Sequence, residues 1–398
     1  MARAGDRWIT RSVVGILLAT FFSDVGHEMV TAVLPMYLAS VGLGAAVLGI
    51  MEGAADLLFS LSKLAGGFVG HHVAEKRPWA TLGYLTTTLG TGALALVRSV
   101  GGLIPLRAIA WFGRGFRSPL RDFLLADEVG PARFGRAYGM ERSADMLGAV
   151  AGPLVAVVLI AAGVSFRNVI LLSIAPSMLS VASIFGLTRD RAPETTPEAA
   201  GAARPRLPAK YWAFLAGVFL FGLGDFSRTF LIFLAARGFG ERAHVAAGLS
   251  VAVLLYAAHN AVSALVAYPV GRLGDRSGKL RILVAGYALG VVTNAMLALG
   301  GASPSWLIVA ILLSGVYIAV EETLEKAVVA ETLPRELRSL GFGILAAANA
   351  LGDLGSSLWV GFQLDRGHAT LAFALPAIVG CAGTAWMAAL IAREMRRR

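Results

Sequence analysis

Three side chains that can exchange protons or bind ligands lie close together in a stretch that is otherwise apolar: Asp24, His27 and Glu28. Asp24 and Glu28 are four residues apart, which places both carboxylates on one face of a helix. A carboxyl group in an apolar environment prefers its protonated form more than it does in water, as a proton carrier requires. The spacing therefore predicts a proton-coupling or substrate site on this stretch.

The same three side chains offer oxygen and imidazole ligands to a divalent metal ion. Three ligands at neighbouring positions of one helix do not all converge on a single point. A metal-ion site at Asp24, His27 and Glu28 is therefore the second interpretation, and the sequence predicts neither a bound metal nor another cofactor.

Further charges in apolar stretches occur as pairs at helical spacing. Asp225 and Arg228 are three residues apart, close enough to neutralise each other, and both a functional and a structural role stay open. Glu52 and Asp56 repeat the four-residue spacing, and Lys63 lies two turns further along that face. We treat these three as secondary candidates, with a structural ion pair as the alternative.

Long apolar segments must hold these charges, because 57% of the residues are hydrophobic and the mean hydropathy is +0.70. Stretches of roughly 20 apolar residues, the length that spans a bilayer, recur along the chain. They predict an all-α membrane protein with twelve transmembrane helices in two pseudo-symmetric six-helix bundles. The helices are expected near 12–38, 46–70, 79–98, 102–125, 137–161, 167–187, 211–235, 245–271, 280–299, 305–328, 340–362 and 370–392.

The two halves of the chain repeat one pattern. The offset that carries Gly67 onto Gly271 also carries Gly70 onto Gly274 and Gly148 onto Gly352. A long internal repeat of this kind indicates a duplicated structural unit. We therefore expect an N-terminal bundle at 1–187, a flexible linker at 188–210 and a C-terminal bundle at 211–398.

The net charge of +10 is unevenly distributed. Lys and Arg gather near the N-terminus, near the C-terminus and in alternate loops, which is the positive-inside pattern of membrane proteins rather than a nucleic-acid surface. We therefore expect a multi-pass protein of the bacterial cytoplasmic (inner) membrane, with both termini and the linker in the cytoplasm.

Charged residues on the fourth and tenth predicted helices occupy related positions of the repeat: Arg114, Arg117 and Arg121, and Glu321, Glu322 and Glu325. The offset places Arg117 on Glu321 and Arg121 on Glu325. Opposite charges at equivalent positions predict a central cavity or a cytoplasmic gate that closes by attraction. Two alternatives stay open: the arginines bind an anionic substrate, or each set pairs within its own bundle, as Arg121 with Asp127 would.

The loop motif Gly271-x-Leu273-x-Asp275-Arg276-x-Gly278-Lys279 resembles the signature loop of the major facilitator superfamily, and the resemblance extends over the full chain. It implies a transporter that works by alternating access between two bundles. The first copy, which begins at Gly67 and Gly70, has His71 and His72 in place of Asp-Arg, so a latch built on that aspartate is absent or rebuilt.

A second motif lies in the fifth predicted helix, where Gly148, Gly152 and Pro153 resemble the GxxxGP motif of the antiporter branches of this superfamily. The alternative is that small residues four apart seat this helix against a neighbour. Segments 24–29, 49–53 and 112–122 also resemble a poorly characterised bacterial subgroup that is described as small-molecule efflux proteins.

These observations predict a secondary active transporter and not an enzyme. We expect it to move a small molecule across the bilayer, to be coupled to protons, to export its substrate and to act as a monomer without nucleic acid. A divalent metal-ion or metal-chelate carrier is the alternative within this class. A non-transporting membrane receptor or structural protein is the alternative from another class.

Overall fold

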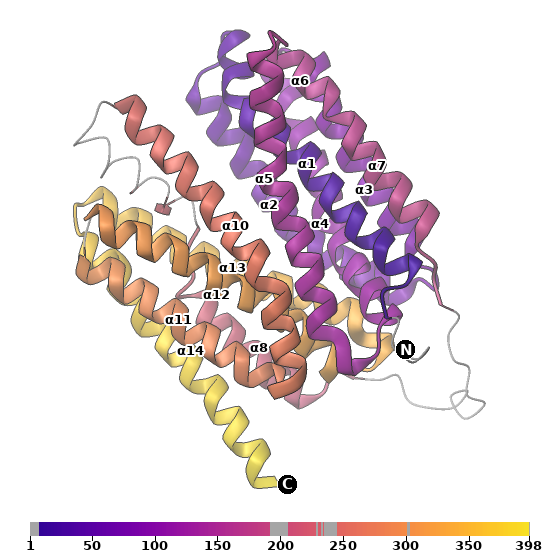
Figure 1. The fold of residues 1–398 in the computed structure, drawn as a ribbon, viewed down its shortest axis with the longest axis vertical. Helices are drawn as coiled ribbons and strands as arrows, with labels where there is room; N and C mark the ends of the chain where they lie inside the picture. The colour runs from indigo at the N-terminus through magenta and orange to yellow at the C-terminus, as the bar shows by residue number, and fades with distance from the viewer. Residues whose placement is uncertain are drawn as a thin grey trace, which may run out of the picture. The chain divides into compact units, whose positions relative to one another are not determined.

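The computed structural model describes residues 8–191, 206–227, 230–231, 234, 245–300 and 303–397. Within these ranges every regular element is a helix, labelled in Figure 1. The helices are α1 Arg11–Ser40, α2 Ala45–His72, α3 Arg77–Ala93, α4 Val100–Glu128, α5 Phe134–Ala161, α6 Phe166–Leu172, α7 Ile174–Leu187, α8 Ala209–Gly222, α10 Val245–Ser277, α11 Lys279–Gly300, α12 Pro304–Thr332, α13 Arg335–Asp365 and α14 Ala369–Arg397.

These helices overlap all twelve predicted spans, with α6 and α7 sharing one span that is interrupted at Ser173. Among the described residues, seven helical segments are long and apolar enough to cross a membrane by themselves. The others are shorter, as α3 and α8 are, or carry several charges, as α2 and α4 do. The all-α membrane fold is confirmed, and candidate functional residues lie both on apolar helices, such as α1 and α12, and on charged ones, such as α2 and α4.

The seventh predicted span, 211–235, is not one continuous helix. Helix α8 ends at Gly222, and residues 225–227 have no regular structure. Asn294 Nδ2 donates a hydrogen bond of 2.7 Å to the carbonyl oxygen of Gly224, which the broken helix leaves without a helical donor. The prediction is therefore wrong at this point, because a side chain from α11 satisfies the backbone that a helix would have satisfied itself.

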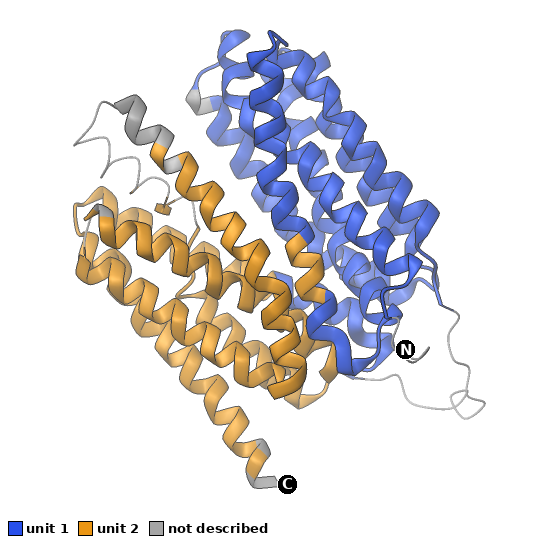
Figure 2. Cartoon of the chain, in the orientation of Figure 1, with its two compact units in different colours: residues 1–137, 144–207, 333–346 blue, residues 138–143, 208–332, 347–398 orange. Residues whose placement is uncertain are grey.

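The chain divides into two compact units, coloured in Figure 2. Unit 1 comprises Met1–Ala137, Ala144–Leu207 and Leu333–Ala346, and unit 2 comprises Tyr138–Ser143, Pro208–Thr332 and Ala347–Arg398. Residues Tyr138–Ser143, within α5, thus belong to unit 2, and the first turns of α13 belong to unit 1. The predicted domains 1–187 and 211–398 stay a prediction, and the compact units differ from them in these short segments.

Glycines allow the close helix contacts inside unit 1. A Cβ atom on Gly113 of α4 would lie 2.7 Å from the carbonyl oxygen of Gly83 in α3. A Cβ atom on Gly67 of α2 would lie 2.8 Å from the Cα atom of Gly343 in α13. Because backbone atoms cannot rotate away as side chains do, the helices approach this closely only where glycine stands.

Apolar side chains lie both inside and outside the units. In unit 1 the buried cluster includes Val30 and Leu34 of α1 together with Leu103 of α4. Large apolar residues on the outside are highly exposed, such as Val158 at 66% and Leu265 at 74%. Exposed apolar helix faces of this kind fit a hydrocarbon environment better than water.

Candidate functional site

Helix α4 carries a row of buried arginines. Arg107, Arg114 and Arg121 are seven residues apart, so they share one helix face, and Arg117 lies beside them, three residues from Arg114 and four from Arg121. Arg107, Arg117 and Arg121 are 1%, 3% and 8% exposed. Buried charges need partners. The partner of each arginine therefore decides whether its guanidinium is neutralised within the protein or can bind a ligand.

Asp24 of α1 forms an ion pair with Arg114, and the two side chains are 4% and 18% exposed. Asp145 of α5 lies within hydrogen-bonding reach of the same aspartate. Two carboxyl groups and one guanidinium therefore meet inside unit 1. Charges that lie this close in a low-dielectric interior interact strongly, so one proton changes the whole group.

The glycines of α5 hold that helix against the acidic face of α1. A Cβ atom on Gly148 would lie 2.8 Å from the Cβ atom of Asp24, and one on Gly152 would lie 2.7 Å from the Cβ atom of Glu28. Pro153 follows within α5, which continues to Ala161. The motif predicted from the sequence thus lies directly against both candidate carboxylates, while its role in transport stays a prediction.

His27 does not join the carboxylates. Its ring is 5% exposed and packs edge-on against Trp111 of α4, with the ring centroids 5.0 Å apart. Within the described ranges, no three His, Cys, Asp or Glu residues gather as a metal site would require. Nothing in this arrangement favours the alternative of a metal carrier based on Asp24, His27 and Glu28.

Arg117 has neutral partners. Its Nη2 atom donates a hydrogen bond of 2.6 Å to Ser23 Oγ of α1, and its guanidinium lies 3.7 Å from the ring centroid of Tyr84 in α3. Its Nε and Nη1 atoms are buried and have no hydrogen-bond acceptor in the structure. Arg117 therefore keeps two donors available within unit 1.

The secondary candidates on α2 have contacts on α4 and on their own helix. Glu52 accepts hydrogen bonds of 3.0 and 3.2 Å from Arg107 of α4. The Nζ atom of Lys63 lies 4.0 Å from the ring centroid of Phe59. Asp56 is exposed. Glu52 and Arg107 thus form a bidentate pair that joins α2 to α4.

Unit 2 contains a second buried acidic group, on α12. Glu325 is 1% exposed. It accepts hydrogen bonds from the hydroxyl group of Tyr287 and, at 2.7 Å, from Asn349 Nδ2. Glu321, one turn earlier, is 5% exposed, and its Oε2 atom has no hydrogen-bond partner. Glu325 therefore lies against neutral donors, whereas the charged neighbours of Glu321 include the carboxyl groups of Asp225, Glu325 and Asp353.

Asp225 lies just beyond the break after α8. It is 8% exposed and accepts a hydrogen bond of 2.8 Å from the hydroxyl group of Tyr317 in α12. Its predicted partner, Arg228, is outside the described residues. The break therefore places a carboxylate at a non-helical point of the chain, as ligand sites of transporters often do.

The charges predicted to form a gate have partners inside their own units. Arg121 pairs with Asp122 at 3.0 Å, not with Asp127. Glu322 pairs with Arg142 at 2.6 Å, and both belong to unit 2. The expected attraction between Arg117 and Glu321, and between Arg121 and Glu325, stays a prediction.

Comparison with known proteins decides the family. A model described as Major Facilitator Superfamily matches residues 16–352 and 244–398. The chain belongs to the major facilitator superfamily. It is therefore a multi-pass membrane transporter and not an enzyme. An uncharacterised transporter of this superfamily from Methanocaldococcus jannaschii, MJ1317, is 25% identical over 361 residues, which cover 90% of this chain and 89% of that protein.

Solved structures share the superfamily fold. The human organic anion transporter MFSD10 superposes with a TM-score of 0.73 at 17% identity, covering 95% of this chain and 99% of that one. The proton:xylose symporter XylE superposes with a TM-score of 0.73 at 14% identity, covering 95% and 94%. At these identities the likeness shows the fold alone.

The two superfamily signature loops differ in their contacts. In the second copy, Asp275 lies 3.6 Å from Lys279, and Gly278 has φ +96°, a conformation that glycine adopts readily. Gly271 is buried and Arg276 is exposed. In the first copy, beyond Gly70, the Nδ1 atom of His71 bonds the carbonyl oxygen of Glu336 at 2.9 Å. His71 of the first copy thus bonds the start of α13, at a position where the second copy has Asp275.

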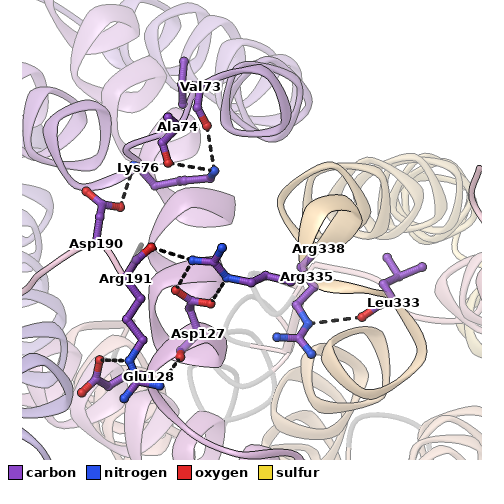
Figure 3. A network of polar contacts seen from close by, with 10 residues as sticks. All are labelled: Val73, Ala74, Lys76, Asp127, Glu128, Asp190, Arg191, Leu333, Arg335 and Arg338. Carbon is purple, nitrogen blue, oxygen red and sulfur yellow. Dashed lines mark hydrogen bonds and ion pairs between the residues drawn. The ribbon is translucent and has the colours of Figure 1, made fainter. Parts of the chain in front are cut away.

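A polar network ties the start of the linker into unit 1 (Figure 3). Arg335 of α13 donates to the carboxylate of Asp127 and, at 2.8 Å, to the carbonyl oxygen of Arg191. Asp190 accepts hydrogen bonds of 2.8 and 3.1 Å from the backbone N–H groups of Lys76 and Arg77, which begin α3. Burial and the nearby Arg335 guanidinium lower the pKa of Lys76. The described start of the linker is therefore held by specific bonds.

Four residues near the site were not among the sequence candidates: Ser23, Tyr84, Arg107 and Trp111. The seven-residue spacing of Arg107, Arg114 and Arg121 was a usable signal, since it marks one helix face. For Ser23, Tyr84 and Trp111, the sequence offers no comparable signal, because each becomes relevant through contact with another helix.

Proposed function

We propose that this transporter is a proton-coupled exporter of a small molecule, with its coupling site at Asp24 and Arg114. The single observation that supports this proposal is the buried ion pair between them. Asp145 beside Asp24 makes the pair sensitive to protons, because two neighbouring carboxyl groups do not easily carry two negative charges.

The coupling follows from the charge of Asp24. While Asp24 is ionised, it holds the guanidinium of Arg114. A proton neutralises the carboxylate and releases the arginine, which then has donors for a substrate. Alternating access requires that binding differ between two states, and this exchange of partners provides such a difference.

For direction and location, we propose export across the bacterial cytoplasmic membrane, with both termini in the cytoplasm and the monomer as the active form. The distribution of Lys and Arg supports this orientation. The likeness of the glycine and proline motif in α5 to that of antiporter branches supports export.

The proposal is tested by proton movement in proteoliposomes that contain the pH-sensitive dye pyranine. Organic acids, amines and sugars are added in turn, and at least one is expected to drive proton movement with the wild-type protein. Asp24→Asn should abolish that movement while exchange of the same radiolabelled solute continues, because exchange does not require release of the proton. Glu28→Gln, on the next turn, tests whether the second carboxylate takes part.

Undiminished proton movement in both variants and in the double variant would remove these residues from the mechanism. Solute transport by the wild-type protein without any proton movement would refute proton coupling itself.

A further inference from the structure

We infer that the substrate is an organic anion, whose negatively charged group is bound by Arg117 and Arg114 of α4. This inference rests on the proposed function and names the substrate class of the same site. It is carried by the unmatched donors of these arginines, by the way Tyr84 orients Arg117, and by the partial exposure of Arg114.

Among the described residues, Arg117 forms no ion pair in contact with a carboxylate, which distinguishes it from its neighbours, although Asp24 lies near enough to act on its charge. Arg107 pairs with Glu52, Arg114 with Asp24 and Arg121 with Asp122. The contacts of Arg117 are the hydroxyl group of Ser23 and the ring of Tyr84. A buried guanidinium without a counter-ion is costly, and an anionic group would both neutralise it and accept its hydrogen bonds.

The orientation of Arg117 suits a planar anionic group. Its guanidinium lies 3.7 Å from the centroid of the Tyr84 ring. A guanidinium stacked on an aromatic ring by its face keeps the N–H donors at its edge available, and these donors match the geometry of a carboxylate. Nε and Nη1 are the donors that lack an acceptor.

Two further donors near Arg117 are also unmatched. Arg114 Nη1 and Trp111 Nε1 are buried without hydrogen-bond acceptors. Arg114 and Trp111 are three residues apart on α4, and Arg117 follows after three more, so the three side chains lie along one side of the helix. Unmatched N–H donors therefore line one side of α4 from Trp111 to Arg117, and the two arginines that bind the anion are adjacent on it.

Arg114 is the more accessible member of its ion pair. Its side chain is 18% exposed, whereas that of Asp24 is 4% exposed. An anion therefore meets Arg114 first and competes with Asp24 for it. Neutralising Asp24 should strengthen anion binding, while removing the charge of Arg117 should weaken it. These opposite effects distinguish an anion site from a structural cluster.

The test uses the purified full chain in detergent, with three anions and their neutral amides as probes. The anions are benzoate, 2-naphthoate and p-toluenesulfonate, and benzylammonium serves as the cationic control. The melting temperature and equilibrium binding of radiolabelled anion are measured. At least one anion should stabilise the wild-type protein, and its amide and benzylammonium should not.

Three variants carry the test. Arg117→Gln should weaken binding of that anion by about tenfold or more, since it removes a charge-assisted hydrogen bond. Asp24→Asn should strengthen it. Arg11→Gln, which changes an exposed arginine at the start of α1, should leave it unchanged. If Arg117→Gln does not fold, Arg117→Lys replaces it, and weakened binding is again expected because lysine lacks the planar fork.

The inference is overturned if none of the three anions binds, if the amides bind as well as the anions do, or if Arg117→Gln and Arg117→Lys both bind like the wild-type protein. Its failure is separate from that of the proposed function. Anion binding without proton movement would refute the coupling alone, and proton-coupled transport of an amine would refute the anion site alone.

Discussion

At the scale of single residues, ion pairs between helices dominate unit 1. The pairs of Asp24 with Arg114 and of Glu52 with Arg107 join α4 to α1 and α2, and the partners in each pair lie far apart in the sequence. Because Arg107 is buried and Arg114 is largely so, the carboxylate partner of each stabilises both the fold and the orientation of the arginine's donors. Binding and stability therefore depend on the same side chains.

The pair of Glu52 and Arg107 should contribute mainly to stability. Glu52→Gln leaves Arg107, which is 1% exposed, without its counter-ion. We expect the free energy of unfolding to fall by about 2 kcal/mol, less than for a fully buried pair because Glu52 is 33% exposed.

The melting temperature of the purified protein measures this effect. Asp56→Asn, an exposed carboxylate one turn away on the same helix, is the control and should melt like the wild-type protein. Equal melting temperatures for all three proteins would show that Glu52 and Arg107 do not stabilise the fold.

At the scale of helices, the contact of α5 with α1 positions the carboxylates. Gly148 and Gly152 place backbone against backbone at the two turns that bear Asp24 and Glu28. A rigid contact of this kind fixes the distance from Asp24 to Asp145, while Arg114 reaches Asp24 from α4. The helix pair, rather than one side chain, therefore sets the geometry of the coupling site.

Gly152→Leu should disturb this contact. A Cβ atom at that position would already lie 2.7 Å from the carbonyl oxygen of Val25, which cannot move aside. We expect α5 to shift, at a cost of about 1–3 kcal/mol, with slower transport or a leaky membrane and near-normal expression.

Transport rate and proton leak in proteoliposomes measure the effect of this substitution. Gly186→Leu is the control, since no atom lies within 4 Å of a Cβ atom at Gly186. If the Gly152 variant transports at the full rate and the membrane does not leak protons, then the close contact at Gly152 is not needed for transport.

At the scale of the whole molecule, the repeat gives the two halves opposite charges at equivalent positions. Arginines of α4 and glutamates of α12 arise from the same offset, and each set is buried within its own unit. The two repeats thus differ chemically at equivalent positions: arginine hydrogen-bond donors are buried in unit 1, and glutamate acceptors are buried in unit 2.

Charge exchange tests whether these interiors attract each other during transport. Because Arg117 is assigned to the anion, the exchange is made at Arg121 and Glu325. Arg121→Glu alone should slow transport by about tenfold, the scale of a coupling energy of 1–3 kcal/mol, and adding Glu325→Arg should restore much of it.

The same exchange at Arg117 and Glu321 is the control, and there transport should not recover, because an arginine at position 321 does not rebuild an anion site in unit 1. Absence of recovery at Arg121 and Glu325 would show that each set pairs within its own unit during the whole cycle.

The sequence by itself determined the number and type of the helices, the repeat and the family. These are local properties: an apolar stretch is long enough to span a bilayer or it is not, and the signature loop at 271–279 is read directly from consecutive residues. Asp24 and Glu28 were predicted as candidates for the same reason, since spacing along one helix needs no tertiary information. Arg107 shares the seven-residue spacing of Arg114 and Arg121, whereas Ser23, Tyr84 and Trp111 carry no comparable signal in the sequence.

Only the tertiary structure decided which charges meet. The packing of α4 against α1 and α2 places Arg114 beside Asp24 and Arg107 beside Glu52. The same packing places Arg117 beside Ser23, a neutral hydrogen-bond partner. The break after Gly222 likewise depends on Asn294 from another helix. Helical periodicity fixes the face on which a residue lies, but helix packing fixes what that face contacts. The donors that define the proposed anion site follow from packing, which no local pattern records.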